Sequence, residues 1–190
     1  RMPKVNKDKT VYTFTLRKDA KWSNGDPVTA QDFVYSWRKE VSKDTAGEYA
    51  YIFPSAGIKN AANILDPKSP LYNQPKKLGI KALDKHTLQV TLERPVPFFI
   101  SLLSFPTFFP KDQKVVEKYG KEYATDADKM VYNGPFVMTA WNHGEGWSYK
   151  KNPKYWDADH IHLKKVNYKI VKEMSSRVNL YQTGQLDYTD

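Results

Sequence analysis

The chain has 190 residues, 40% hydrophobic and 14% aromatic, so it can bury a core and is not a disordered segment. Thirty Lys and Arg against 21 Asp and Glu give a net charge of +9, but the basic residues never run beyond pairs and acidic residues are interleaved with them. This pattern argues against a nucleic-acid-binding stripe. The absence of cysteine excludes disulfides and cysteine zinc sites, and no apolar run approaches the ~20 residues of a membrane-spanning helix.

The first predicted elements are a strand, a polar turn and a helix. Residues 11–17 alternate between apolar and polar side chains, which predicts a strand with one buried face. In the turn SNGDP, Gly25 can supply a positive φ. Thr29 then opens a helix, with Asp32 three residues on as in a capping box. Five apolar residues at helical spacing predict its buried stripe: Ala30, Phe33, Val34, Trp37 and Val41.

An aromatic segment, YAYIF, follows at 49–53. We expect Ile52 and Phe53 to be core residues. Tyr49 and Tyr51 also carry hydroxyls, and a tyrosine can stack on an extended peptide while it donates to the peptide backbone. The segment therefore contains two candidate ligand-binding residues next to two core residues.

The centre of the chain predicts short helices and one hairpin. A short helix is expected from about Ser55 to Leu65, and the three prolines within residues 66–75 predict a loop. Alternation on both sides of the turn DKH, over 78–82 and 88–92, predicts a hairpin with one buried side. Two more helices are predicted: a buried one from Phe98 to Leu103, and one from Asp112 to Tyr119 that Gly120 closes.

From Tyr132 onward the pattern is mostly strand. The turn NGP leads into the predicted strands 136–141, 147–151 and 166–170, and a helix over 174–181 is closed by Gly184. Another strand is predicted to start at 186–188. Because the chain begins just before one strand and stops as another begins, and opens with RMP and no signal-peptide pattern, we expect a piece of a longer protein whose targeting segment, if it has one, has been removed.

Two groups of polar residues are candidate chemical sites. The segment DADHIH at 157–162 would project both histidines to one side of a strand, but with no third ligand we expect a solvated loop and no metal. The carboxylates of Glu122, Asp126 and Asp128 are close in sequence, and we expect solvated positions for them in place of a catalytic pair. No P-loop, nucleophile elbow or HExxH motif occurs, so no catalytic residue and no cofactor is predicted.

Several segments, in chain order, share the pattern of one known family. Residues 12–37 match YTFxLRxxxKWxxGxPxTAxDxxxSW, and four further segments follow: LDKHTLQVTL with PVPFF, NGPF, NPKYW and GQLD. Together they resemble the extracellular solute-binding proteins of peptide ABC importers. NGPF departs from the family's GTGPY in having Asn where the family has Thr. The segment DTAGEY at 44–49 is similar to one in the oligopeptide-binding branch and favours that branch.

The resemblance implies a mixed α+β fold of the periplasmic-binding-protein type, with mixed sheets flanked by helices. Family members are much longer, so the resemblance also implies a fragment of the N-terminal lobe. Residues 1–130 would be the small middle domain and residues 131–190 part of the main N-terminal α/β domain, with the C-terminal lobe and the N-terminal anchor absent. Trp22 and Trp37 would lie where strand and helix pack together.

The function implied by the resemblance is capture of extended oligopeptides between two lobes, for delivery to the permease subunits of an importer, without catalysis. By alignment Tyr49 would contact the peptide, with Tyr51 and Asp190 as further candidate ligand-binding residues. The expected location is the extracellular face of the cell membrane, through a lipid anchor, or the periplasm.

Three alternatives remain open at this point. One is a peptide- or pheromone-sensing protein with the same fold. A second, of another class, is a basic, aromatic-rich nucleic-acid-binding module, suggested by the charge of +9. A third is a carbohydrate-active enzyme, suggested by the aromatic content, which would need a convergent pair of carboxylates.

Overall fold

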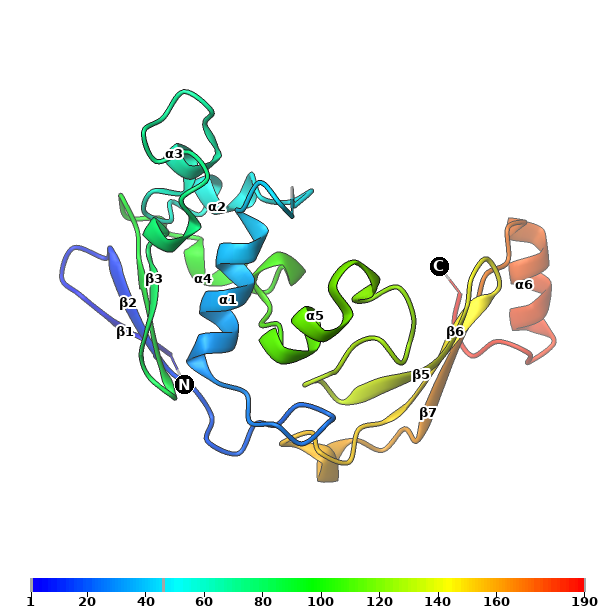
Figure 1. Cartoon of the computed structure of the whole chain (residues 1–190). Coiled ribbons are helices and arrows are strands. Elements are labelled where there is room, and N and C mark those ends of the chain that lie inside the picture. Colours follow the sequence, from blue (N-terminus) through cyan, green and yellow to red (C-terminus); the bar gives the residue numbers. More distant parts are fainter. Residues whose placement is uncertain (1, 46, 190) are drawn as a thin grey trace.

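The computed structural model describes residues 2–45 and 47–189 and places them in two parts, each built on its own antiparallel sheet (Figure 1). The strands are β1 (Lys4–Val5), β2 (Val11–Thr15), β3 (Ile80–Asp84), β4 (Thr87–Thr91), β5 (Phe136–Asn142), β6 (Gly146–Lys151) and β7 (Lys165–Lys169). The α-helices are α1 (Ala30–Glu40), α2 (Ile52–Ser55), α3 (Ala61–Leu65), α4 (Phe99–Leu102), α5 (Gln113–Tyr119) and α6 (Met174–Gln182). Four short 3-10 helices complete the elements: η1 (Pro75–Lys77), η2 (Pro106–Phe108), η3 (Gly120–Glu122) and η4 (Ala158–His160).

The first sheet has the order β1-β2-β4-β3, and all its pairs are antiparallel. The register places Tyr12 opposite Val90 and Phe14 opposite Leu88, so the apolar residues of β2 and β4 share one face. This confirms the predicted strand and the predicted hairpin with one buried side. Because strand side chains alternate, the opposite face carries the polar residues of the same strands.

Helix α1 covers the buried face of this sheet (Figure 1). Its N-terminus has the predicted capping pair, in which the Asp32 carboxylate accepts hydrogen bonds from the Thr29 backbone N–H (2.7 Å) and hydroxyl (3.1 Å). The predicted stripe is also confirmed, since four of its residues are buried and Phe33 packs against them. Trp37 is 2% exposed, and its indole N–H donates to the carbonyl of Phe108 at 2.8 Å, which ties α1 to η2.

The single helix predicted from about Ser55 to Leu65 is wrong in detail. The chain forms two short helices, α2 and α3, separated by a tight turn. Gly57 (φ +69°) and Asn60 (φ +66°) both adopt the left-handed conformation, which a continuous right-handed helix does not allow. The helix predicted over 98–103 is buried only in part, because Phe99 is fully buried while Phe98 is 54% exposed.

The second sheet has the order β5-β6-β7, also antiparallel, and matches the three strands predicted after residue 132. The predicted helix is α6, with Gly184 (φ +70°) beyond its end. Residues 186–189 form no strand, contrary to the prediction; strand hydrogen bonds need a neighbouring strand, and no described segment lies in register beside them. Neither β7 nor α6 contains a buried residue, so this part has a much smaller core than the first.

Hydrogen bonds join the two parts at the loop that follows β2. The Ser23 backbone N–H donates to the carbonyl of Tyr132 at 2.7 Å, and the Tyr132 N–H donates back to the Ser23 hydroxyl at 3.1 Å. The guanidinium of Arg17 lies 3.4 Å from the ring centroid of Trp156. Trp22, in the same loop, is 3% exposed, so Trp22 and Trp37 are both buried, as the family resemblance implied. These contacts hold the polar turn of the first part against the chain that enters the second sheet.

Candidate functional site

Three exposed aromatic side chains, Tyr49, Tyr51 and Phe105, form an aromatic cluster on the first part. Their exposed fractions are 41%, 62% and 36%. The rings of Tyr49 and Phe105 meet edge to face with centroids 5.2 Å apart, and those of Tyr49 and Tyr51 are 6.3 Å apart. Exposed aromatic rings that touch one another in this way offer a large apolar contact area with polar hydroxyls at its edge.

The local fold explains why these tyrosines point outward. Ala50, between them, is buried, and so is Phe53 after them, which turns the side chains of Tyr49 and Tyr51 toward solvent. Turn hydrogen bonds fix this arrangement, from Ala50 N–H to Gly47 O (3.0 Å) and from Phe53 N–H to Ala50 O (3.1 Å). The expectation that Phe53 is core is therefore confirmed.

A glycine and an ion pair support the segment before the cluster. A Cβ at Gly47 would lie 2.4 Å from the Glu40 carboxylate and 2.8 Å from the Glu40 carbonyl oxygen, so this close approach requires glycine. The same carboxylate pairs with Lys111 at 3.1 Å. The Tyr49 segment is thus held close against the end of α1.

Sequence reasoning identified two of the three members of the aromatic cluster. It missed Phe105, which lies between α4 and η2 and is 56 positions from Tyr49 in the sequence. The only local signal was an aromatic residue before Pro106 outside any periodic segment. Asp190, the third candidate from the resemblance, lies outside the described residues.

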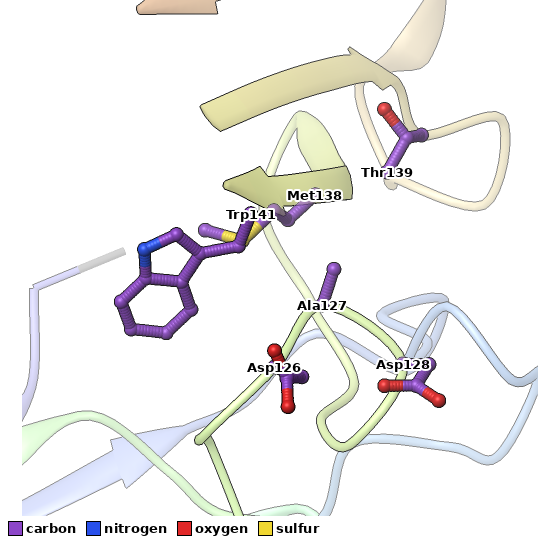
Figure 2. A pocket seen from close by; sticks show the side chains of 6 residues that line it. All are labelled: Asp126, Ala127, Asp128, Met138, Thr139 and Trp141. Carbon is purple, nitrogen blue, oxygen red and sulfur yellow. The ribbon is translucent and has the colours of Figure 1, made fainter. Parts of the chain in front are cut away.

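A second candidate is a hollow of about 300 Å³ between the loop after α5 and strand β5 (Figure 2). Figure 2 shows the side chains that line it: Asp126, Ala127, Asp128, Met138, Thr139 and Trp141. The imidazole of His143 stacks on Trp141 with centroids 4.5 Å apart and contacts the Asp126 carboxylate at 3.1 Å. A carboxylate and an indole thus face a common space from two different elements.

The charges beside this hollow are largely compensated. The Lys129 ammonium lies 3.0 Å from the Glu122 carboxylate and 3.7 Å from that of Asp126. The hydrogen bond to Glu122, with the nearby carboxylates, raises the pKa of Lys129 above its usual value. Two of the acidic residues singled out in the sequence, Glu122 and Asp126, therefore pair with a lysine, and the third, Asp128, is exposed at the hollow.

Two other ionisable groups, Tyr132 and Asp32, have pKa values that are shifted by their surroundings. Burial raises the pKa of Tyr132 to about 12, with Tyr149 and Tyr123 adding to the effect. Burial likewise raises the pKa of Asp32 above its usual value, although hydrogen bonds from Thr29 and Trp22 oppose the shift. Neither group lines the hollow or belongs to the aromatic cluster.

The two histidines of DADHIH do not lie on one strand face. His160 belongs to the 3-10 helix η4, and its Nδ1 pairs with the Asp157 carboxylate at 2.5 Å, which raises the pKa of this imidazole. His162 is exposed in the irregular segment that follows. Within residues 2–45 and 47–189, no group of three or more His, Cys, Asp or Glu has the geometry to hold a metal ion.

The chemistry of these surfaces favours binding. The aromatic cluster offers ring faces and two phenol groups, and the hollow offers a compensated carboxylate beside an indole.

Comparison with known proteins identifies the family. The family described as "Bacterial extracellular solute-binding proteins, family 5 Middle" matches over residues 1–190. Among curated proteins, a dipeptide-binding protein of Lactococcus lactis subsp. cremoris is 43% identical over 189 residues, which cover 97% of this chain and 33% of that protein. The chain thus spans 33% of the length of this relative.

Solved structures agree with this result. The peptide-bound OppA of Listeria monocytogenes is 48% identical with a TM-score of 0.91, covering 98% of this chain and 36% of that one. The pheromone receptor PrgZ, described with its mode of peptide binding, is 35% identical with a TM-score of 0.90, at coverages of 98% and 36%. The expected fold, mixed α and β of the periplasmic-binding-protein type, is confirmed. Among the described helices, none is both long and apolar enough to cross a bilayer.

Proposed function

This chain belongs to family 5 of the bacterial extracellular solute-binding proteins, and we propose that it forms part of the oligopeptide-binding component of an ABC importer. In this proposal the intact protein captures extended peptides between two lobes and presents them to the permease subunits, without chemical change to the peptide. The names of its relatives, dipeptide-binding and oligopeptide-binding proteins, support the class of ligand.

The observation that carries the proposal is the aromatic cluster. Tyr49 and Tyr51 are exposed while Ala50 and Phe53 anchor the segment in the core. Aromatic rings contact a peptide side chain at a low entropic cost, and a phenol can donate to a peptide carbonyl. We therefore assign Tyr49 and Tyr51 as peptide-contacting residues, with Phe105 supporting Tyr49.

The domain organisation is part of the same proposal. Residues 1–130 would be the middle domain of one lobe and residues 131–190 would contribute to its main domain. Two separate antiparallel sheets, joined through the loop after β2, support this division. The proposed location is the extracellular face of the cell membrane, through a lipid anchor, or the periplasm. Peptide sensing, suggested by the likeness to PrgZ, would use the same capture surface.

The proposal is tested by titration calorimetry with a mixture of tetra- and pentapeptides. We expect a longer polypeptide that spans the relatives' full length to release heat on binding, and this chain alone to bind weakly or not at all. Submillimolar binding by the chain alone would contradict the two-lobe mechanism. Absence of binding by the longer polypeptide would contradict peptide capture.

The contribution of the aromatic cluster is tested in the longer polypeptide. We expect Tyr49→Ala to weaken peptide binding about 5- to 30-fold, since an aromatic contact with its hydrogen bond is worth about 1–2 kcal/mol. The matched control is Tyr72→Ala, a tyrosine in the proline-rich loop with no aromatic partner in the described chain. Equal affinity for the Tyr49→Ala variant and the parent would remove Tyr49 from the site.

A further inference from the structure

The second sheet has two faces of opposite character, and the register of β6 with β7 defines them. Trp147 is opposite Tyr168 and Tyr149 is opposite Val166, so these side chains share one face. That face is aromatic: the rings of Trp147 and Tyr168 stack with centroids 5.3 Å apart. The alternate positions make up the other face, which we call the lysine face: Ser148, Lys150, Lys165, Asn167 and Lys169.

The lysine face concentrates uncompensated positive charge. Lys150 and Lys165 are direct cross-strand partners, and Lys169 lies four residues further along β7, on the same side. All three side chains are exposed, and in the described chain none of them forms an ion pair. Like charges directly opposite each other in an antiparallel pair repel and are destabilising. This repulsion would be relieved by an anion placed over the pair.

The surrounding sequence adds to this charge. Between residues 146 and 180, eight Lys and Arg stand against three Asp and Glu, so this stretch holds more than half of the chain's net charge of +9. On the lysine face, the Ser148 hydroxyl donates to the Asn167 side-chain oxygen at 2.9 Å. That bond orients the Asn167 amide and leaves its N–H groups available to an acceptor.

The lysine face is suited to remain in water in a larger protein. Lysine is almost never fully buried without a partner, and burying several unpaired lysines together would be very costly. The aromatic face of the same sheet is the side suited to packing, as in antiparallel sheets with one solvated side. Further chain added to this part would therefore cover the aromatic face and leave the lysine face exposed.

We propose that the lysine face docks this protein on the surface of an anionic lipid bilayer, with lipid phosphate groups between Lys150, Lys165 and Lys169. The sheet presents these three charges on one side, which suits a laterally extended array of anionic headgroups. Each lysine close to such a surface contributes to binding, and the effect weakens as salt screens it. Such docking would hold the binding protein beside the membrane in which a permease lies.

The test is sedimentation of the 190-residue chain with vesicles of phosphatidylcholine and phosphatidylglycerol, compared with pure phosphatidylcholine vesicles. We expect binding only to the anionic vesicles, decreasing with salt. The triple variant Lys150→Gln, Lys165→Gln and Lys169→Gln should bind about 100-fold more weakly at low salt. The matched control, Lys4→Gln, Lys81→Gln and Lys85→Gln, removes the same charge from exposed positions of the first part and should change binding no more than about 3-fold.

Three results would overturn the proposal. The first is an equal loss of vesicle affinity in the two triple variants, and the second is equal binding to neutral and anionic vesicles. The third is tighter binding to duplex DNA than to anionic vesicles, with the same loss of DNA affinity in the variant that lacks Lys150, Lys165 and Lys169. Folding is checked separately, since removing the Lys150–Lys165 repulsion should leave the melting temperature equal or higher. The assay contains no peptide, so its outcome is independent of the calorimetric test of peptide capture.

Discussion

Replacement of Trp37 by phenylalanine tests whether the main core is organised around this side chain. The indole N–H donates to the carbonyl of Phe108 at 2.8 Å, and both groups are buried. The indole also meets the rings of Phe53 and Phe108 edge to face, with centroids 5.7 and 5.1 Å away. The substitution removes one hydrogen bond and part of the apolar volume but keeps an aromatic ring.

The expected loss follows from these contacts. A buried carbonyl left without its donor costs about 1–3 kcal/mol. Loss of part of the indole adds a fraction of the ~3–5 kcal/mol of a full Trp→Ala change. We therefore expect the Trp37→Phe variant to be less stable by about 2–4 kcal/mol. Phe53→Leu, which removes the ring contacts with Trp37 and Phe108 but no side-chain hydrogen bond, should cost about 1–1.5 kcal/mol.

The assay is urea unfolding followed by far-ultraviolet circular dichroism, with free energies taken from the shift in midpoint. The control is Trp156→Phe, because Trp156 is 41% exposed and its contact with Arg17 persists with another ring. This variant should lie within about 0.5 kcal/mol of the parent. If Trp37→Phe also lies within about 0.5 kcal/mol, the buried hydrogen bond and ring packing do not stabilise the fold as argued.

Three further predictions concern other positions. Gly146→Ala should disrupt the pairing of β6 with β7, because the added Cβ would meet the Tyr168 carbonyl, and should abolish the aromatic contribution of that sheet to near-ultraviolet circular dichroism. The control Gly134→Ala, where a Cβ meets nothing within 4 Å, should have little effect. Asn152→Ala should cost about 2–4 kcal/mol in thermal unfolding, since a 1% exposed side chain then no longer satisfies the Gly134 carbonyl (2.9 Å) and the Lys154 N–H (3.0 Å). Burial raises the pKa of Asp32 above 3.8, so the folded chain holds this proton to a higher pH than the unfolded chain. The free energy of unfolding, taken relative to that of the Asp32→Asn variant, should therefore fall as pH rises from 3.8 through the folded pKa. A difference between the two proteins that does not change with pH would contradict the shift.

Features set by neighbours in sequence were predictable. The capping pair of Thr29 and Asp32, the stripe of α1 and the alternation of β2 and β4 are local patterns, and each is present in the structure. The outward direction of Tyr49 and Tyr51 is partly local too, because it follows from the burial of Ala50 and Phe53. Two of the three residues of the aromatic cluster were therefore accessible to sequence reasoning.

Features that depend on long-range pairing were not predictable in the same way. The contact of Phe105 with Tyr49 joins segments separated by a complete hairpin. The left-handed conformation of Asn60, which divides the helix expected over 55–65, depends on its surroundings: its side chain donates to the Lys77 carbonyl at 2.7 Å and its N–H to the Glu93 carboxylate at 2.9 Å. Likewise, the meeting of Lys150 with Lys165 needs the register of β6 and β7.

The two proposed surfaces lie on different sheets, and this separation bears on how the protein could work. The aromatic cluster is anchored in the main core by Phe53, so its rings are held in place before a ligand arrives and less conformational entropy is lost on binding. The lysine face lies on the second sheet, which the loop containing Ser23 joins to the first part. Because the two surfaces share no residue, we expect peptide capture and membrane docking to be compatible. Charge removal on the lysine face should therefore leave peptide affinity unchanged in the longer polypeptide. Conversely, Tyr49→Ala should leave vesicle binding unchanged. Loss of both peptide binding and vesicle binding in either variant would show that the two surfaces are not independent.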